Sequence, residues 1–423
     1  MKRRINRSRK RKLQEKRVKK NLIKEKATSF IVGIIILGTL VVMSSYMPKA
    51  LNHNPTISNI DETENITDKV TNSEVKQSNA NLKGVWLRTV YNLDFPKTQG
   101  AENQKKEIIN IVNNLKKNQI TDVFFQVRPH GDALYKSNIN PWSKVLTGEQ
   151  GVDPGYDPLR FLLDEASKYN IKVHAWLNPY RLVVGNDDLS NLVESHPVKK
   201  VSEMVLYDSS NKPFLNPGSS YTLSHIEKTV EELLINYPDI ASIHMDDYFY
   251  PEGYVAQFEK DSPLQDKLRE DITKMIEAVK KITSRYNNRF GVSPSGIWKN
   301  SSSDKLGSKT SGNESYYSVA ADTKLWIDNE YIDYIVPQLY WSSENNLADY
   351  EILVEWWSDT VKNSEVDLYI GQGIHSEEVA KEIDYQINFN KQFDNIAGSV
   401  FYSYGDMINN LNIIDKINYC FNN

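Results

Sequence analysis

Cysteine is almost missing from this sequence. Its 423 residues include a single cysteine, Cys420, close to the C-terminus. One cysteine excludes an internal disulfide, and it leaves a Cys-based metal site or a Cys/His catalytic dyad without its second member. The chemistry of the protein therefore has to rest on other side chains.

Histidine pairs of the kind that bind metal ions are also absent. The seven histidines form neither a His-x-His nor a His-x-x-x-His pair, and zinc sites in hydrolases are commonly built on such clusters. No strand is followed by Gly-x-Gly-x-x-Gly, and no P-loop sequence occurs. We therefore expect no metal, no nucleotide and no other cofactor.

Beyond the first 26 residues, acidic residues outnumber basic ones. Residues 1–26 contain 14 Lys and Arg against two Glu, a net charge of +12, whereas the whole chain has a net charge of -4. The remaining residues therefore carry a net charge of -16. An acidic body behind a basic arm argues against nucleic-acid binding by the body.

Long apolar runs are absent too, with one exception near the N-terminus. Residues 27–48 carry no charge, and residues 30–43 are almost entirely apolar. This span is about long enough to cross a bilayer core, and the Lys and Arg before it favour the cytoplasmic side. The pattern predicts a cytoplasmic polybasic arm (1–26), a single transmembrane helix that acts as a signal anchor (27–48), and a C-terminal domain outside the bacterial cell membrane.

A cleaved signal peptide is the alternative for this segment, because its strongly apolar part is short. Residues 44–47, Ser-Ser-Tyr-Met, make a poor cleavage site, and no cysteine follows for lipid attachment. Residues 49–80 are polar and lack periodicity, which predicts a flexible linker. The folded domain is expected at residues 81–423.

Strand and helix patterns alternate from residue 82 to the end of the chain. Short apolar stretches predict eight strands, at residues 82–88, 122–128, 172–177, 239–245, 289–293, 332–341, 367–371 and 397–403. Amphipathic stretches predict helices at residues 103–117, 158–169, 225–237, 264–286, 317–329, 347–363, 377–392 and 407–419. This alternation is typical of an α/β fold, the (β/α)₈ TIM barrel. Long loops at residues 129–156, 178–221 and 294–316 follow strands and so belong to the carboxyl face.

Two carboxylates end the fourth predicted strand. Asp246 and Asp247 are followed by Tyr248, Phe249 and Tyr250. Barrel enzymes carry their chemistry at the carboxyl ends of the strands. Aromatic rings beside acids suit a sugar, whose C–H faces stack on rings while its hydroxyls bond to carboxylates. The alternative is a helix cap, because an Asp after a strand often starts the next helix.

Glycoside hydrolysis needs one carboxyl that donates a proton and another that acts as nucleophile or base. We expect Asp246 to face the mouth of the barrel as nucleophile or transition-state stabiliser. Along an extended chain the side chain of Asp247 points away from that of Asp246. Asp247 is therefore predicted to orient Asp246 or to bind sugar. The proton donor stays open, with Asp132 as the candidate catalytic residue and Asp94, Glu344 and Asp322 as alternatives.

The other predicted strand ends carry amides, basic groups and aromatic rings, which are side chains suited to binding a glycan. The predicted substrate-binding residues are Arg128, His130, Asn178, Tyr180, Arg181, His244, Tyr248, Trp298, Gln338, Tyr340 and Trp341. Structural roles are the alternatives for several of them. Arg128 could pair with Asp132, Asn178 could shape a turn, His244 could belong to the core, Trp298 and Trp341 could pack beneath loops, and Asp322 could cap a helix.

Eight motifs in order along the domain resemble the glycosyl hydrolase-like 10 family of bacterial envelope proteins. They lie at residues 84–94, 125–135 (FQVRPHGDALY), 154–159, 174–181 (HAWLNPYR), 215–218, 243–251 (IHMDDYFYP), 291–298 and 333–341. The resemblance implies a (β/α)₈ glycosidase domain, a cell-wall glycan substrate such as peptidoglycan, and a nucleophile that closes the fourth strand, here Asp246. Many members are lipoproteins, but this chain lacks the lipobox cysteine, so its own helix is expected to anchor it.

Together these features predict an extracytoplasmic glycoside hydrolase that cleaves a cell-wall polysaccharide by carboxylate catalysis. The expected substrate is the glycan strands of peptidoglycan. A non-catalytic glycan-binding scaffold of the envelope, built on the same barrel, is the alternative, because no proton donor stands out.

Overall fold

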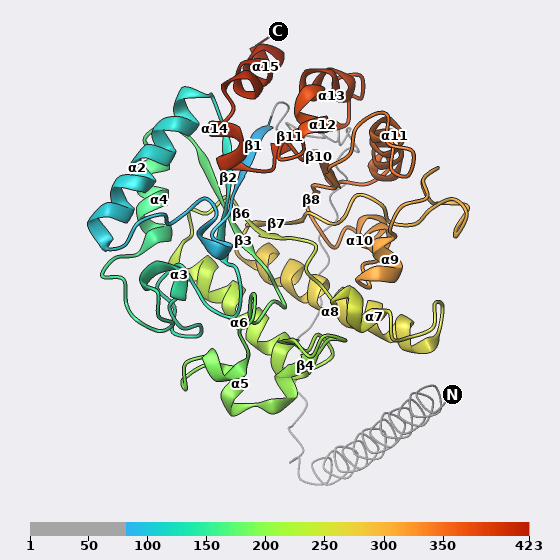
Figure 1. Ribbon diagram of the computed structural model, residues 1–423. Coiled ribbons are helices and arrows are strands. Elements are labelled where there is room, and N and C mark those ends of the chain that lie inside the picture. Colours follow the sequence, from blue (N-terminus) through green and yellow to red (C-terminus); the bar gives the residue numbers. More distant parts are fainter. Residues whose placement is uncertain (1–81, 423) are drawn as a thin grey trace, which may run out of the picture. The chain divides into compact units, whose positions relative to one another are not determined.

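The strands predicted after residue 81 form a closed parallel barrel. The computed structural model describes residues 82–422. Around the barrel the strands are β1 (Leu82–Leu87), β2 (Asp122–Arg128), β3 (Lys172–Leu177), β6 (Ser242–Met245), β7 (Arg289–Val292), β8 (Tyr334–Ile335) with β9 (Gln338–Leu339), β10 (Asp367–Gln372) and β11 (Ile396–Phe401). β11 pairs with β1 in parallel, from Leu82↔Gly398 to Val85↔Phe401, which closes the barrel. The eight-stranded barrel expected from the sequence is thus confirmed, with helices around it (Figure 1).

The sixth barrel strand differs from its prediction. In place of one strand over residues 332–341, the chain forms β8 and β9, separated by Val336 and Pro337. Proline has no N–H to donate to a neighbouring strand, so the ladder is interrupted there. Val336 still donates to the carbonyl of Val292 at 2.8 Å, which keeps the segment in the barrel wall.

Several helices begin at caps that can be read in the sequence. Asp157 accepts a hydrogen bond from the N–H of Arg160 at 3.0 Å, at the start of α4 (Pro158–Ser167). Ser262 caps α8 (Pro263–Arg285) in the same way. Each cap is followed by a proline, whose fixed φ suits the first helical turn. The other long helices are α2 (Ala101–Lys117), α6 (Ser220–Asn236), α11 (Tyr350–Val361) and α15 (Leu411–Asn422).

Three predicted helices are each replaced by two shorter ones. Residues 317–329 contain parts of α9 (Ser315–Ser318) and α10 (Thr323–Asp328), and Ala320 between them has a φ of 60°, outside the helical region. The later pairs are α12 (Glu377–Lys381) with α13 (Ile383–Asn390), and α14 (Tyr404–Ile408) with α15. The loops after β2, β3 and β7 are long, as predicted. The loop after β3 carries an antiparallel hairpin of β4 (Val205–Tyr207) and β5 (Pro213–Leu215).

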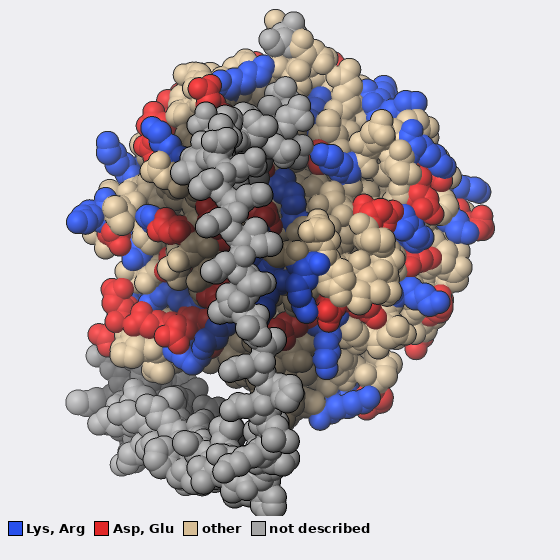
Figure 2. Space-filling view, turned by 180° about the vertical axis from the view of Figure 1, so that it is seen from behind, with Lys and Arg blue, Asp and Glu red and all other residues tan. Residues whose placement is uncertain are grey.

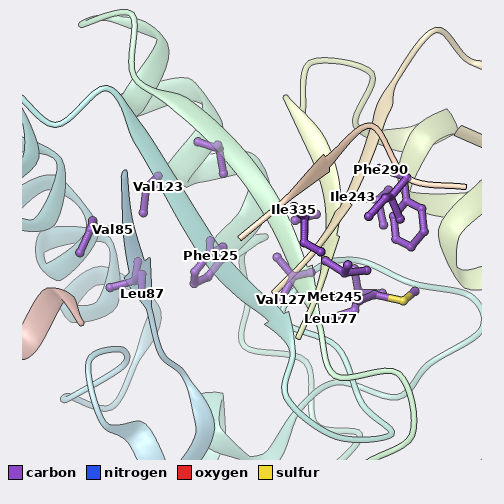
Figure 3. Close-up of a cluster of buried hydrophobic side chains, with 14 of the residues drawn as sticks. Val85, Leu87, Val123, Phe125, Val127, Leu177, Ile243, Met245, Phe290 and Ile335 are labelled. Carbon is purple, nitrogen blue, oxygen red and sulfur yellow. The ribbon is translucent and has the colours of Figure 1, made fainter. Parts of the chain in front are cut away.

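Side chains along the strands alternate between two apolar layers, as a strand period of two requires. The outer layer packs with helix residues such as Ile108 and Val112 of α2. Its strand members include Val85, Leu87, Val123, Phe125, Ile243 and Met245 (Figure 3). The interior of the barrel is more aromatic and contains Leu82, Trp86, Phe124, Trp176, Tyr334, Val336, Tyr369, Ala397 and Val400.

Polar side chains cross this aromatic interior in a continuous hydrogen-bonded series. Asp122 lies 2.8 Å from Nε2 of His174, whose Nδ1 lies 2.6 Å from the hydroxyl of Ser242. Ser242 contacts the hydroxyl of Tyr334 at 2.7 Å, and this hydroxyl lies 3.1 Å from Nδ1 of His244. We call these five residues the interior polar chain. Because each member has a partner, their burial carries little of the cost of an unpaired polar group.

The polybasic arm, the predicted signal anchor and the linker lie outside the described residues. Between residues 82 and 422, no helix combines the length and the apolar character needed to span a membrane. Figure 2 shows basic and acidic side chains interspersed over most of the visible surface of this part of the chain.

Gly291 of β7 leaves room for the ring of Tyr334, a member of the interior polar chain. A Cβ on Gly291 would lie 2.2 Å from carbons of that ring. We expect Gly291→Ala to lower the free energy of unfolding by about 1–3 kcal/mol, as overpacking of a core does. Urea denaturation measures the change. Leu411→Ala, at a side chain that is 69% exposed, is the control and should change stability by less than about 0.5 kcal/mol. Equal stabilities of the two variants would contradict this packing.

Candidate active site

Asp246 lies at the carboxyl end of β6, where three N–H groups bind its carboxylate. Its Oδ2 accepts from Nε1 of Trp176 at 3.1 Å and from the side-chain amide of Asn178. Its Oδ1 accepts from the backbone N–H of Tyr248 at 3.2 Å. Asp246 is only 5% exposed. These donors therefore replace most of the water that an exposed carboxylate would bind.

Asp246 and Asp247 form a coupled pair of carboxyls. Burial, followed by repulsion from Asp247, raises the pKa of Asp246 to about 7. Burial also raises the pKa of Asp247, although Arg181 and a hydrogen bond from Gln338 oppose the rise. A buried carboxyl and a half-buried one that repel each other do not both ionise readily, so the pair keeps one proton to a higher pH than isolated carboxyls do.

Strand alternation does not apply to the two carboxyls, because both lie beyond the end of β6. β6 ends at Met245, and the backbone turns immediately afterwards. The N–H of Tyr248 returns to the Asp246 carboxylate, and the N–H of Phe249 donates to the carbonyl of Asp247 at 2.9 Å. Alternation of side chains applies only to an extended strand. It therefore says nothing of Asp247, which lies beyond the strand.

Arg181 supplies positive charge beside the pair. Its Nη1 donates to Oδ1 of Asn178 at 3.1 Å, and its guanidinium carbon lies 4.3 Å from the centre of the Tyr248 ring. Its attraction lowers the pKa of both Asp246 and Asp247, against the larger effect of burial. Arg181 thus favours the form of the pair in which one carboxyl is ionised.

Two tyrosines form an aromatic wall at the same mouth. Tyr340 follows β9 and Tyr402 follows β11, and their rings stack with centroids 5.4 Å apart. Asp246 contributes to raising the pKa of each hydroxyl, after burial, so both rings lie within electrostatic reach of the pair. Arg88, at the end of β1, lies 5.1 Å from the centre of the Tyr402 ring. Its guanidinium also binds both oxygens of Asp94, at 2.9 Å each, so this alternative proton donor is engaged in an ion pair.

Gln126 of β2 connects the strands behind the pair and was not among the predicted site residues. Its Nε2 donates to Oδ1 of Asn178 at 2.7 Å, and its Oε1 accepts from the N–H groups of Thr89 and Val90, both at 2.9 Å. Because Oδ1 of Asn178 accepts from Gln126, the amide nitrogen of Asn178 is left to donate to Asp246. A glutamine between Phe125 and Val127 in a buried strand was the available sequence signal.

Five residues predicted to bind substrate are buried behind the mouth, namely Arg128, His130, Tyr180, His244 and Trp298. Nη1 of Arg128 donates to the carbonyl of Asn178 at 2.8 Å and so supports the loop after β3. His244 ends the interior polar chain, with Nε2 lying 3.0 Å from the hydroxyl of Ser293. These side chains have hydrogen-bond or packing partners within the protein, and their contact with substrate stays a prediction.

Asp132 forms a buried pair with His130 and is not in the hydrogen-bonded group around Asp246. Its Oδ1 lies 2.9 Å from Nδ1 of His130, and its Oδ2 accepts from Gln150 at 3.0 Å. Burial alone would raise the pKa of Asp132, but His130 and the surrounding hydrogen bonds lower it to about 2. A carboxyl with so low a pKa is ionised at neutral pH and has no proton to donate. The partner of Asp132 is thus His130 and not Arg128.

The two remaining alternative proton donors, Asp322 and Glu344, and the predicted substrate-binding residue Trp341 lie on the loops after β7 and β9. Asp322 caps α10 by accepting from the N–H of Leu325, and it also accepts from Nε1 of Trp298 at 2.9 Å. The helix-cap alternative for Asp322 is therefore confirmed. Trp341 is half-buried against Gly296, and Glu344 is exposed. Across residues 82–422, no three His, Cys, Asp or Glu side chains gather as metal ligands.

The coupled pair predicts a pH-dependent stability. Folding raises the pKa of Asp246 from 3.8 to about 7, so the native state binds this proton more tightly than the unfolded chain. The resulting stabilisation is fully present below pH 3.8 and is lost as the pH rises through about 7. Asp246→Asn cannot ionise, and it should therefore raise the free energy of unfolding more at pH 8 than at pH 5. Guanidinium denaturation at both pH values measures this difference.

Asp239→Asn is the control for this experiment. The carboxyl of Asp239 pairs with Arg160, whose hydrogen bond holds the pKa of Asp239 below its usual value. Both groups are charged at pH 5 and at pH 8, so removal of this carboxyl should change stability equally at the two pH values. The same pH-independent result for Asp246→Asn would contradict a raised pKa.

Known proteins resemble this chain over most of its length. The profile of the family described as glycosyl hydrolase-like 10 matches residues 81–393. The glycosyl hydrolase YngK of Bacillus subtilis is 37% identical over 367 residues, which cover 81% of this chain and 72% of YngK. The glycosyl hydrolase DigH of Escherichia coli K12 is 36% identical over 345 residues, 74% of this chain and 78% of DigH.

A solved structure shares the barrel fold. The endo-1,4-beta-mannanase of Rhizomucor miehei superimposes with a TM-score of 0.52 over 77% of this chain and 86% of its own, at 12% identity. An identity this low speaks for the fold alone. The sequence matches carry the family assignment, and they agree with the eight motifs found along the domain. The chain therefore belongs to the glycosyl hydrolase-like 10 family.

Proposed function

We propose that this protein hydrolyses glycosidic bonds in a cell-wall polysaccharide, with peptidoglycan glycan strands as the substrate. The observation that carries the proposal is the pair of adjacent carboxyls at the end of β6, Asp246 and Asp247, of which Asp246 is buried and accepts from three N–H groups. Glycosidases need a protonated and an ionised carboxyl at the same time. The choice of substrate is supported by the resemblance of the motifs to those of bacterial envelope proteins that act on cell-wall glycan.

The hydrogen bonds suggest different roles for the two acids. Asp246 accepts from Trp176, Asn178 and the N–H of Tyr248, and three donors stabilise an ionised carboxylate. Asp247 has fewer donors, Gln338 and a backbone N–H. Because the two carboxyls interact, the proton that they hold belongs to the pair and not to one residue. We assign the negative charge of the singly protonated pair to Asp246 and its proton to Asp247.

The proposed reaction follows from these two roles, a protonated Asp247 and an ionised Asp246. The proton of Asp247 moves to the glycosidic oxygen as the bond between C1 and that oxygen breaks. The carboxylate of Asp246 stabilises the positive charge that develops at C1. A water molecule adds its oxygen to C1 and returns a proton to Asp247, so both acids end in their initial state. The rings of Tyr340 and Tyr402 offer flat faces on which a pyranose can stack.

We also propose that residues 27–48 anchor the domain outside the cell membrane. The support is the sequence pattern, in which an uncharged span follows an arm with a net charge of +12. Protease added to intact cells should remove the barrel while a cytoplasmic marker protein stays whole. Protection of the barrel until the cells are lysed would place the domain inside and would contradict this orientation.

Loss of either acid is expected to stop cleavage without unfolding the barrel. Asp246→Asn and Asp247→Asn should each lower kcat on peptide-free glycan strands by about 10²–10⁴-fold, since each removes one half of the acid and carboxylate pair. Sugar fragments released into solution are counted by mass spectrometry, and circular dichroism checks the fold of each variant.

Asp322→Asn is the matched control, because Asp322 caps α10 and accepts from Trp298. This variant should keep kcat within about twofold of the native value at temperatures below its Tm. Native rates with Asp246→Asn would refute the assignment. If the native protein retains glycan strands but releases no fragments, a non-catalytic glycan-binding scaffold explains the site instead.

A further inference from the structure

Tyr91 is held in an unusual backbone conformation and exposes its ring at the mouth of the barrel. It lies in the turn that follows β1, with a φ of 55° and a ψ of 20°, and the next residue, Asn92, has a φ of 54°. This left-handed region disfavours any residue with a Cβ, and for a bulky aromatic residue it is a rare conformation. Tyr91 is nevertheless 60% exposed, so burial of its ring does not compensate for the conformation.

The turn is fixed by the side chain of Asn92. Its amide nitrogen donates to the carbonyl of Pro96 at 2.8 Å and to the carbonyl of Val145, in the loop after β2, at 2.9 Å. A short polar residue tolerates the left-handed region because it can form such local bonds. Nothing comparable holds the ring of Tyr91. The surrounding contacts therefore determine the backbone and leave the ring presented to solvent.

The same turn is connected to the catalytic pair through two buried side chains. The N–H of Val90, the residue before Tyr91, donates to Oε1 of Gln126 at 2.9 Å. Gln126 donates to Asn178 at 2.7 Å, and Asn178 donates to Asp246. Each of these contacts is a hydrogen bond between neighbouring strand ends. The position of the Tyr91 backbone is therefore fixed relative to Asp246.

The Tyr91 ring reaches from the turn after β1 to the long loop after β3. A Cβ on Gly185 would lie 3.8 Å from the Tyr91 hydroxyl and 3.9 Å from Cε1 of the ring. Gly185 itself has a φ of 60°, where glycine is the residue that fits without strain. The loop thus approaches one edge of the ring at a residue without a side chain, and most of the ring surface stays free.

Resting on the proposed function, we infer that Tyr91 is the aromatic platform of an outer sugar-binding subsite. It would stack on the C–H face of a pyranose unit of a strand whose scissile bond lies at Asp246. An exposed ring in a strained turn is typical of a site where conformation is kept for binding. Tyrosine suits the task, since it offers a rigid flat surface and a polar hydroxyl. The subsite would favour long glycan strands over short ones.

Kinetics on glycan strands of graded length test this inference. The probe is peptidoglycan glycan freed of its peptides and fractionated by length. Tyr91→Ala should lower kcat/KM on long strands by about fivefold to tenfold, mainly through KM, and the loss should grow with strand length. Tyr91→Phe keeps the ring and should stay close to the native value. Tyr286→Ala removes a half-exposed tyrosine at the amino-terminal end of β7 and serves as the control.

A comparison of Tyr91→Gly with Tyr91→Ala separates binding from structure. Both variants lack the ring and should lose the same activity. Glycine fits a φ of 55° and alanine does not, so Tyr91→Gly should have a higher Tm than Tyr91→Ala. A glycine variant that is less stable than the alanine variant by the full entropy cost of glycine, about 0.5–1 kcal/mol, would show that the turn carries no strain and would overturn the inference.

Failure of this inference can be told from failure of the proposed function. If the native protein cleaves the strands and Tyr91→Ala has the native kcat/KM at every length, the platform is refuted and the hydrolase stands. If the native protein neither cleaves nor retains any strand, both are refuted.

Discussion

A buried carboxylate needs several N–H donors, and the arrangement of this site depends on supplying them to Asp246. The register of β3 against β6 pairs Leu177 with Met245. The next residues on the two strands are Asn178 and Asp246, so the amide and the carboxylate face each other where the strands end. One turn of backbone then brings the N–H of Tyr248 to the second oxygen. The site is therefore a direct product of strand pairing in the barrel.

The hydrogen bonds of this site also make its parts interdependent. Asn178 accepts from Gln126 and Arg181 and donates to Asp246, so one amide links β2, β3 and β6. Removal of one member would leave its partners buried without a hydrogen bond, which costs about 1–3 kcal/mol for each group. Substitutions at Gln126 and Asn178 should therefore not add independently, and a double-mutant cycle is the proper way to compare them.

Local sequence patterns predicted the barrel and the place of Asp246, because strand length, apolar character and the acid at the strand end are all properties of short segments. Contacts between distant segments were beyond such patterns. Tyr180 is covered because its carbonyl accepts from the N–H of Leu215, which is remote in sequence. The partner of Asp132 could not be read either, since it depends on how the loop after β2 folds. Strand alternation does not bear on Asp247 either, because β6 ends at Met245.

The interior polar chain has a consequence for how the barrel selects its strand alignment. An aliphatic interior tolerates a strand that slips by two residues, since similar side chains then meet again. Here His174 faces Ser242 across β3 and β6, and Tyr334 pairs with Gly291 across β7 and β8. A slip at either junction would separate hydroxyls and imidazoles that have no water to bind. The buried polar residues thus make misaligned barrels energetically distinct from the native one, and they confer fidelity during folding.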